Sequence, residues 1–171
     1  EQEDVDDTYQ FIADHADIYS HHLDDKIPWD AWINGTALPA AFVNDIAGRK
    51  SKKIAGHQRL VSVSILTSTR GDVIEDYDGQ SPSYDSLNEQ RMEDAFVKHL
   101  EYVIDELEPH YLVMAMEVNE LFIHNPSLWE EYKKLMPAVR SRIKVKYPNV
   151  LLSESMTLHN WYQANVGNPT A

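Results

Sequence analysis

The sequence contains no cysteine, only six glycines and no long apolar run. Without cysteine the chain has no disulfide, no thiolate metal site and no thiol nucleophile. Its apolar runs fall short of the roughly 20 residues that a bilayer-spanning helix needs. Basic residues are scarce as well, since 15 Lys and Arg stand against 28 Asp and Glu, for a net charge of −13. An acidic surface repels nucleic acid and anionic membranes, so we expect neither as a partner.

The remaining composition is that of an ordinary globular domain. Of the 171 residues, 43% are hydrophobic and 25% are charged, which predicts one domain with a sizeable core, spanning residues 1–171. An acidic, globular chain of this kind is compatible with a neutral ligand such as a sugar.

Apolar periodicity predicts helices that alternate with strands. The predicted helices are 4–15, 38–55, 87–107 and 128–146, and the predicted strands are 17–23, 59–67, one starting near 110, and 149–155. Ser86 with Glu89 predicts a capping box for the third helix, and Pro137 predicts a kink or break in the fourth. Residues 28–39 and 68–85 are predicted loops, the second of them unusually long.

This alternation indicates parallel strands with right-handed crossovers. Two architectures fit, a doubly wound sheet or part of a (β/α)8 barrel. No glycine-rich phosphate loop follows any predicted strand, which weakens the doubly wound, nucleotide-binding alternative. The predicted fold class is therefore α/β and TIM-barrel-like.

The segment HYLVMAMEVNELF, which starts at His110, is the most informative for function. An apolar run indicates a strand that is buried on both faces, and such strands carry function at their carboxyl ends. Glu117, Asn119 and Glu120 follow directly, and polar groups clustered there need water, a ligand or hydrogen bonds. We therefore predict a functional site at this strand end.

Other candidate residues follow the neighbouring predicted strands. His21 and His22 must point to opposite faces of their strand, so at most one belongs to the site. Glu154 ends the last strand, His159 follows it, and Trp161 has the flat surface on which a sugar ring stacks. Trp29 and Trp32 are better explained by core packing.

The same residues resemble a known family. A strand ending in Asn119-Glu120 is similar to the fourth strand of the retaining (β/α)8 glycoside hydrolase clan. DIYSHHLDDKIPW resembles the second strand of an endo-galactanase-like or related barrel hydrolase, and LLSESMTLHNW resembles the fifth strand with its loop. The resemblance implies that Glu120 is the general acid/base and that Asn119 donates to a sugar hydroxyl. It makes Glu117, His22, Glu154, His159 and Trp161 candidates for binding substrate. For Glu117 the alternative is a core-facing side chain paired to a neighbouring residue, which we favour.

The resemblance also implies an incomplete barrel, from about helix 1 to strand 5. The clan's nucleophile ends the seventh strand, and a full barrel typically has about 250 residues. We therefore expect the isolated chain to be inactive, and the remaining strands to come from the same polypeptide or another chain. The expected partner is a carbohydrate, no cofactor or metal is expected, and a secreted or periplasmic location follows from the resemblance alone.

Two alternatives stay open at this point. The histidines and carboxylates at successive strand ends could hold a divalent metal, as in metal-dependent barrel isomerases and hydrolases, although no H-x-H or H-E-x-x-H spacing occurs. The chain could instead be a non-catalytic, carbohydrate-binding or structural piece of a barrel.

Overall fold

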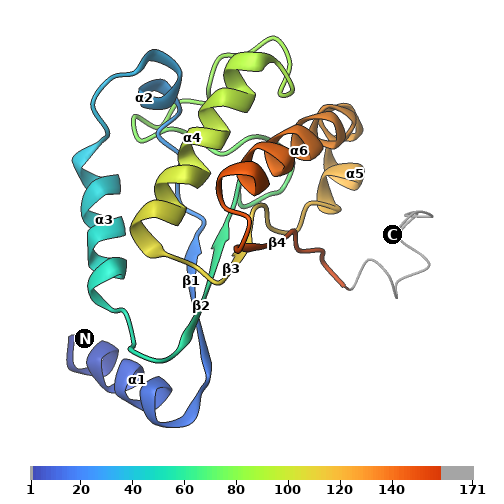
Figure 1. The fold of residues 1–171 in the computed structure, drawn as a ribbon. Helices are drawn as coiled ribbons and strands as arrows, with labels where there is room; N and C mark the ends of the chain where they lie inside the picture. Colours follow the sequence, from blue (N-terminus) through green and yellow to red (C-terminus); the bar gives the residue numbers. More distant parts are fainter. Residues whose placement is uncertain (1, 159–171) are drawn as a thin grey trace.

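The computed structural model describes residues 2–158, which form an α/β fold around a four-stranded, all-parallel sheet (Figure 1). The strands hydrogen bond in the order in which they occur in the chain, and they are β1 (Ile18–Leu23), β2 (Gln58–Val63), β3 (Tyr111–Val113) and β4 (Leu151–Ser153). Each of the three pairings is parallel. The predicted α/β class and parallel strands are therefore confirmed.

Helices alternate with these strands, as the periodicity predicts. They are α1 (Gln2–His15), α2 (Trp29–Asn34), α3 (Ala40–Ser51), α4 (Gln90–Leu107), α5 (Glu120–His124) and α6 (Pro126–Lys146). The sequence did not predict the two short helices α2 and α5. Helix α2 lies within the predicted loop 28–39, and it ends at Gly35, whose φ of 69° is the left-handed angle that glycine adopts without strain.

The helices that connect the strands lie on one face of the sheet. Right-handed crossovers between strands in sequential order place every connecting helix on the same side. Helix α4 accordingly packs between α3 and α6, and it contacts both (Figure 1). Four parallel strands with their connecting helices on one face do not close a barrel, so the barrel stays a prediction.

Alternation along the strands separates a helix-covered face from an open face. Residues turned toward the helices are buried, namely Tyr19, His21, Arg59, Val61, Leu112 and Leu152. We call the other side the open face, and its strand residues are Ile18, Ser20, His22, Gln58, Leu60, Ser62, Tyr111, Val113, Leu151 and Ser153. Ile18 is 45% exposed and Leu151 is 55% exposed there, so no helix covers these side chains.

The hydrophobic core lies between the sheet and the helix layer. Helix α4 supplies much of it, because its apolar residues recur at helical spacing, and Phe96, Leu100, Val103 and Leu107 are essentially inaccessible to solvent. Each such side chain contributes roughly 1.5–3 kcal/mol on burial. Buried Arg59 of β2 donates to the Tyr19 hydroxyl and to the Leu107 carbonyl, so it links two strands to the end of α4.

Three local predictions were wrong. Ser86 does not cap α4, because the helix begins at Gln90, the N-cap is Glu89, and the Ser86 hydroxyl donates to the Asn88 side chain instead. Pro137 does not break α6, which continues through it to Lys146, whereas the alternative of a kink there stays a prediction. The strand that starts near 110 is short, since β3 ends at Val113 and the chain then bends.

The long loop after β2 is largely irregular, as predicted. A single antiparallel bridge between Leu66 and Val73 closes its first turn, and both residues are fully buried. Within residues 2–158, no helix is long and apolar enough to cross a membrane.

Candidate functional site

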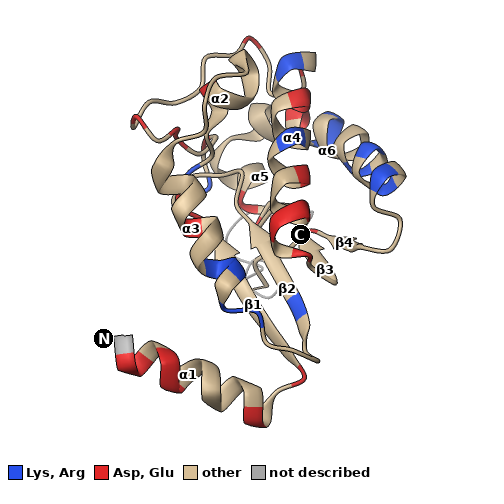
Figure 2. Ribbon diagram, turned by 60° about the vertical axis from the view of Figure 1, so that its left-hand side comes forward, with Lys and Arg blue, Asp and Glu red and all other residues tan. Residues whose placement is uncertain are grey.

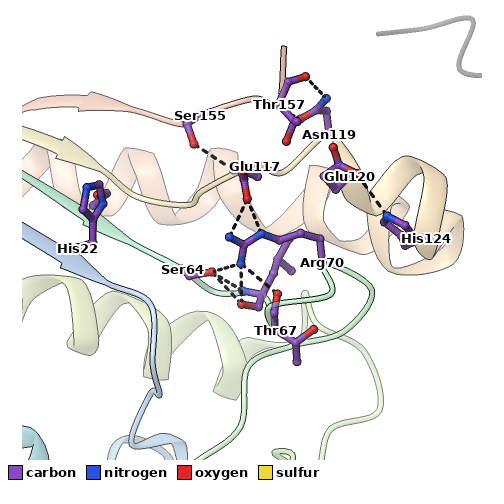
Figure 3. A network of polar contacts seen from close by, with 12 residues as sticks. His22, Ser64, Thr67, Arg70, Glu117, Asn119, Glu120, His124, Ser155 and Thr157 are labelled. Carbon is purple, nitrogen blue, oxygen red and sulfur yellow. Dashed lines mark hydrogen bonds and ion pairs between the residues drawn. The ribbon is translucent and has the colours of Figure 1, made fainter. Parts of the chain in front are cut away.

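An ion pair between Arg70 and Glu117 lies just beyond the carboxyl ends of β2 and β3 (Figure 3). The guanidinium donates to Glu117 Oε2 from Nε at 2.8 Å, and its second terminal nitrogen lies 2.7 Å from the same oxygen. The Arg70 side chain is 17% exposed, whereas that of Glu117 is 44% exposed. The pair therefore presents a partly accessible carboxylate that bonds to a less accessible cation.

Two serines place this pair on the open side of the sheet. Ser64 continues the open-face alternation of Leu60 and Ser62, and its hydroxyl accepts from Arg70 at 3.2 Å. Ser155 continues the alternation of Leu151 and Ser153 in the same way, and its hydroxyl accepts from the backbone N–H of Glu117 at 3.0 Å. Residues that follow β2, β3 and β4 thus meet at the carboxyl-terminal end of the sheet, as the ends of parallel strands do.

The backbone is unusual at both members of the ion pair. Arg70 has φ of 57° and Glu117 has φ of 53°, left-handed angles that cost a non-glycine residue roughly 1–2 kcal/mol. Arg70 is held there because its guanidinium also donates to the carbonyls of Thr67 and Leu66. Such strain concentrates at functional sites, where surrounding contacts impose a geometry that the local chain does not prefer.

Asn119 has a structural partner. Its amide nitrogen donates to the Thr157 carbonyl at 3.2 Å, and its oxygen accepts from the Thr157 N–H at 2.7 Å. This two-way contact fastens the chain after β4 to the bend after β3. The side-chain oxygen and one N–H are therefore already engaged, which leaves the residue poorly placed for the predicted donation to a sugar hydroxyl.

Glu120 was predicted to lie at the end of a strand, and the structure places it on a helix. It is the first residue of α5 and not the tip of a strand, and only 8% of it is exposed. Its Oε2 lies 3.3 Å from Nε2 of His124, one turn further along the same helix. Figure 3 shows this contact on the far side of Glu117 from His22. Of the Glu117 and Glu120 carboxylates, that of Glu117 is the more accessible to solvent at the carboxyl-terminal end of the sheet.

The two consecutive histidines point to opposite faces, as alternation predicts. His21 faces the helices, is buried against the rings of Tyr9 and Tyr19, and burial together with the nearby Arg59 lowers its pKa to about 4. His22 lies on the open face, with its Nδ1 2.6 Å from the Ser62 hydroxyl. It therefore shares a face with Glu117, although Figure 3 shows it set apart from the ion pair.

Glu154 does not join the site. Its carboxylate accepts from the hydroxyl of Tyr132 on α6 at 2.6 Å, so it turns toward the helix layer. Alternation explains this placement, because Leu152 faces the helices and Glu154 is two residues further on. Substrate binding by Glu154 therefore stays a prediction, and in the structure its partner is Tyr132.

The remaining sequence candidates are two tryptophans and two residues near the C-terminus. His159 and Trp161 lie outside the described residues. Trp29 is fully buried and donates to the Ile74 carbonyl, and the half-buried Trp32 packs among aromatic rings and donates to His99. The core-packing interpretation of both is confirmed.

Metal binding finds no support in the described part of the chain. Residues 2–158 contain no group of three or more His, Asp or Glu side chains that could hold an ion together. A separate cavity of about 210 Å³ lies between α2 and the loop after β2, lined by Trp29, Asp30, Asp76, Asp78 and Arg91 among others. Asp76 and Asp78 accept backbone N–H groups, and Asp30 accepts from the Asn34 side chain, so these aspartates stabilise the local chain.

Arg70 and Ser64 are the site residues that the sequence interpretation missed. Arg70 is the sole basic residue of the segment 68–85, which is otherwise rich in acids. This single basic residue, in an acidic loop that directly follows a buried strand, is the feature of the sequence that could have indicated Arg70 as a site residue. The sequence matches no known protein-family model, and comparison with curated proteins finds no match either.

Proposed function

We propose that this chain is a glycoside-hydrolase-like barrel segment that binds carbohydrate at the carboxyl ends of its parallel strands. Glu117, held by Arg70 on the open side, supports this assignment more than any other feature. A half-exposed carboxylate that an ordered cationic neighbour holds in place offers sugar hydroxyl groups a charged acceptor. The net charge of −13 is compatible with a neutral ligand of this kind.

The proposal moves the principal carboxylate from Glu120 to Glu117. Glu120 is mostly buried on α5 beside His124, whereas Glu117 stands where three strand ends meet. The exposed His22, which contacts the buried Ser62 hydroxyl, extends the polar surface of the open face toward β1. Retaining hydrolysis needs two carboxyl groups about 5–5.5 Å apart, so turnover requires a second carboxylate beside Glu117.

Titration with a panel of neutral oligosaccharides, followed by calorimetry or NMR, tests the binding. Glu117→Gln should weaken binding about tenfold, or about 1.4 kcal/mol, because the amide accepts less strongly and loses the ion pair. Glu130→Gln is the matched control, since Glu130 is an exposed glutamate of α6 that is also held in an ion pair, with Lys133. Equal affinities for both variants, or no binding by wild type, would refute the proposal.

Hydrolysis separates the two glutamates. In the active assembly, loss of a general acid harms substrates with poor leaving groups more than activated ones, and azide rescues the second step. We expect this pattern for Glu117→Gln and only a structural defect for Glu120→Gln. The reverse result would restore Glu120 as the acid/base. Binding without turnover under all conditions would identify a carbohydrate-binding segment.

A further inference from the structure

We propose that a small cavity between α3, α4 and the loop after β1 binds one ordered water molecule, which accepts a hydrogen bond from Nε2 of His99 and donates to carboxylates around it. The cavity lies at the carboxyl end of β1, because Leu23 and the residues that follow it form part of the lining. None of the lining residues belongs to the Arg70–Glu117 ion pair, and no carbohydrate is involved. The two proposals therefore stand or fall separately.

The size of the cavity is the first observation. Its volume is about 20 Å³, and residues from four segments line it, namely the loop after β1, helix α3, the loop after β2 and helix α4. One water molecule needs roughly 10–15 Å³ of such space, so the cavity admits a single water and no larger ligand. The polar lining includes Asp24, Asp25, Asp45, Arg49, Tyr77 and His99.

The second observation is an unpartnered donor on His99. The residue is 1% exposed, and among the described residues its Nε2 has no hydrogen-bond partner. Burial lowers the pKa of His99 to about 3, so the ring is neutral. Nδ1 accepts from the indole nitrogen of Trp32 at 3.3 Å, and an indole can only donate. Nε2 therefore carries the ring hydrogen, and a buried N–H that lacks an acceptor costs free energy.

The third observation is that acceptors line the same cavity. Both signs of charge occur on α3 (Figure 2), and at the cavity they pair, since Arg49 donates to Asp45 Oδ2 at 2.8 Å. Burial, together with the nearby Asp25 and Asp45, raises the pKa of Tyr77 to about 12, so its hydroxyl keeps its proton beside these carboxylates. A water that accepts from His99 and donates to two of these oxygens has the two to four partners that buried waters usually have.

The same groups exclude other small ligands. A cation cannot bind Nε2 while this nitrogen carries its hydrogen, and within residues 2–158 no three His, Asp or Glu side chains are grouped so that they could hold a metal ion. An anion could accept from Nε2, but the carboxylates of Asp24, Asp25 and Asp45 would repel it. Water fits because it accepts from one group, donates to another and carries no charge.

The bound water would fasten the loop after β1 to the helix layer. His99 belongs to α4, Asp45 to α3 and Asp25 to the loop, so one water joins three segments that are distant in the sequence. Loss of the water should therefore allow this loop to open more often, which speeds hydrogen exchange of its backbone amides.

Rotating-frame NMR on the full chain tests the water, because it distinguishes a bound water from proton exchange. For the wild type we expect cross-relaxation from a long-lived water to the Nε2–H of His99 and to the ring protons of Tyr77. The ring nitrogen chemical shifts of His99 should be those of the tautomer that is protonated at Nε2. A wild type without the water signal, or a ring protonated at Nδ1 instead, would overturn the proposal.

Two substitutions of His99 separate the donor from the ring. His99→Gln keeps an N–H donor on the side chain and should keep the water signal at Tyr77. His99→Phe has no donor and should lose this signal, and the Asp25 amide should then exchange several-fold faster. His15→Phe is the matched control, because it makes the same change at the end of α1, outside the cavity lining, and should alter neither measurement.

Circular dichroism identifies any variant that fails to fold, and the measurement on the wild type decides the proposal in that case. A water signal at Tyr77 that persists in His99→Phe would show that His99 does not hold the water. Equal exchange rates of the Asp25 amide in His99→Phe and wild type would show that no water fastens the loop. Either result would overturn the inference.

Discussion

Arg70 and Glu117 form an ion pair in which both partners hold left-handed backbone angles, at φ of 57° and 53°. Arg70 follows β2 and Glu117 follows β3, so the pair joins two irregular segments at the carboxyl-terminal end of the sheet. Bonds outside the pair hold both residues in place, because Arg70 also donates to the Leu66 and Thr67 carbonyls and the Glu117 N–H donates to the Ser155 hydroxyl. The pair is therefore a structural contact as well as the centre of the candidate site.

The two partners should contribute unequally to stability. Arg70→Ala removes bonds to Ser64 and to the Leu66 and Thr67 carbonyls together with the ion pair, and should lower the free energy of unfolding by about 1–2 kcal/mol. Glu117→Gln should cost less than about 1 kcal/mol, because its side chain is 44% exposed and water screens the pair. Urea denaturation measures both. A larger loss for Glu117→Gln would contradict this asymmetry.

The backbone strain at Arg70 has its own test. Arg70→Gly loses the same side-chain bonds as Arg70→Ala, but glycine adopts φ of 57° without a steric penalty. The glycine variant should therefore be more stable than the alanine variant by about 1 kcal/mol, despite the extra entropy of its unfolded chain. At an ordinary helical position such as Arg49 the order should reverse. Equal stabilities of the two Arg70 variants would show that this backbone stores no strain.

Asn119 should stabilise the segment that follows β4. Asn119→Ala removes both contacts with the Thr157 backbone, at about 1 kcal/mol each, and should speed hydrogen exchange of the Thr157 amide. Asn149→Ala is the control, because Asn149 is an exposed residue in the turn before β4. Unchanged exchange at Thr157 would mean that other contacts hold this segment.

The fold could be predicted because its signals are local. Apolar alternation and helical spacing marked all four strands and the four longer helices, and the alternation of elements indicated a parallel sheet. The boundaries were less accurate, since tertiary contacts decide where an element ends. Ser86 has the spacing of a capping residue, yet α4 starts at Gln90.

The site could be predicted only in part, for a geometric reason. Position along a strand gives a side chain's direction only while the strand continues, and β3 ends at Val113. The bend after it turns Glu117 toward Arg70 and places Glu120 on a helix, which a motif of two residues cannot show. Alternation did separate His21 from His22, because β1 is regular to Leu23.

Glu154 should have no part in ligand binding. It accepts from Tyr132, whose hydroxyl is buried on α6, and burial together with the neighbouring carboxylate raises the pKa of Tyr132 well above its ordinary value. Glu154→Gln should leave oligosaccharide affinity unchanged, and Tyr132→Phe should cost about 1 kcal/mol of stability. Affinity measurements beside urea denaturation check both outcomes. A loss of affinity in Glu154→Gln without a loss of stability would return Glu154 to the site.

Two buried histidines should make the protein sensitive to mild acid. Complete burial lowers the pKa of His99 to about 3, and burial with the nearby Arg59 lowers the pKa of His21 to about 4. Below a pH of about 6.5 the unfolded chain therefore takes up protons that the folded chain does not. Stability is complete above that pH and falls as the pH drops toward the folded-state pKa values, by up to about 1.4 kcal/mol per pH unit for each histidine.

His99→Phe should remove about half of this pH dependence between pH 6.5 and 5, before most carboxylates titrate. The ring of His99 already stacks on Phe96 and packs against Phe42, so phenylalanine fits the surroundings, although Trp32 loses its acceptor. Urea denaturation at several pH values gives the slope. His15→Gln, at the end of α1, should keep the wild-type slope. An unchanged slope in His99→Phe would show that His99 does not cause the acid sensitivity.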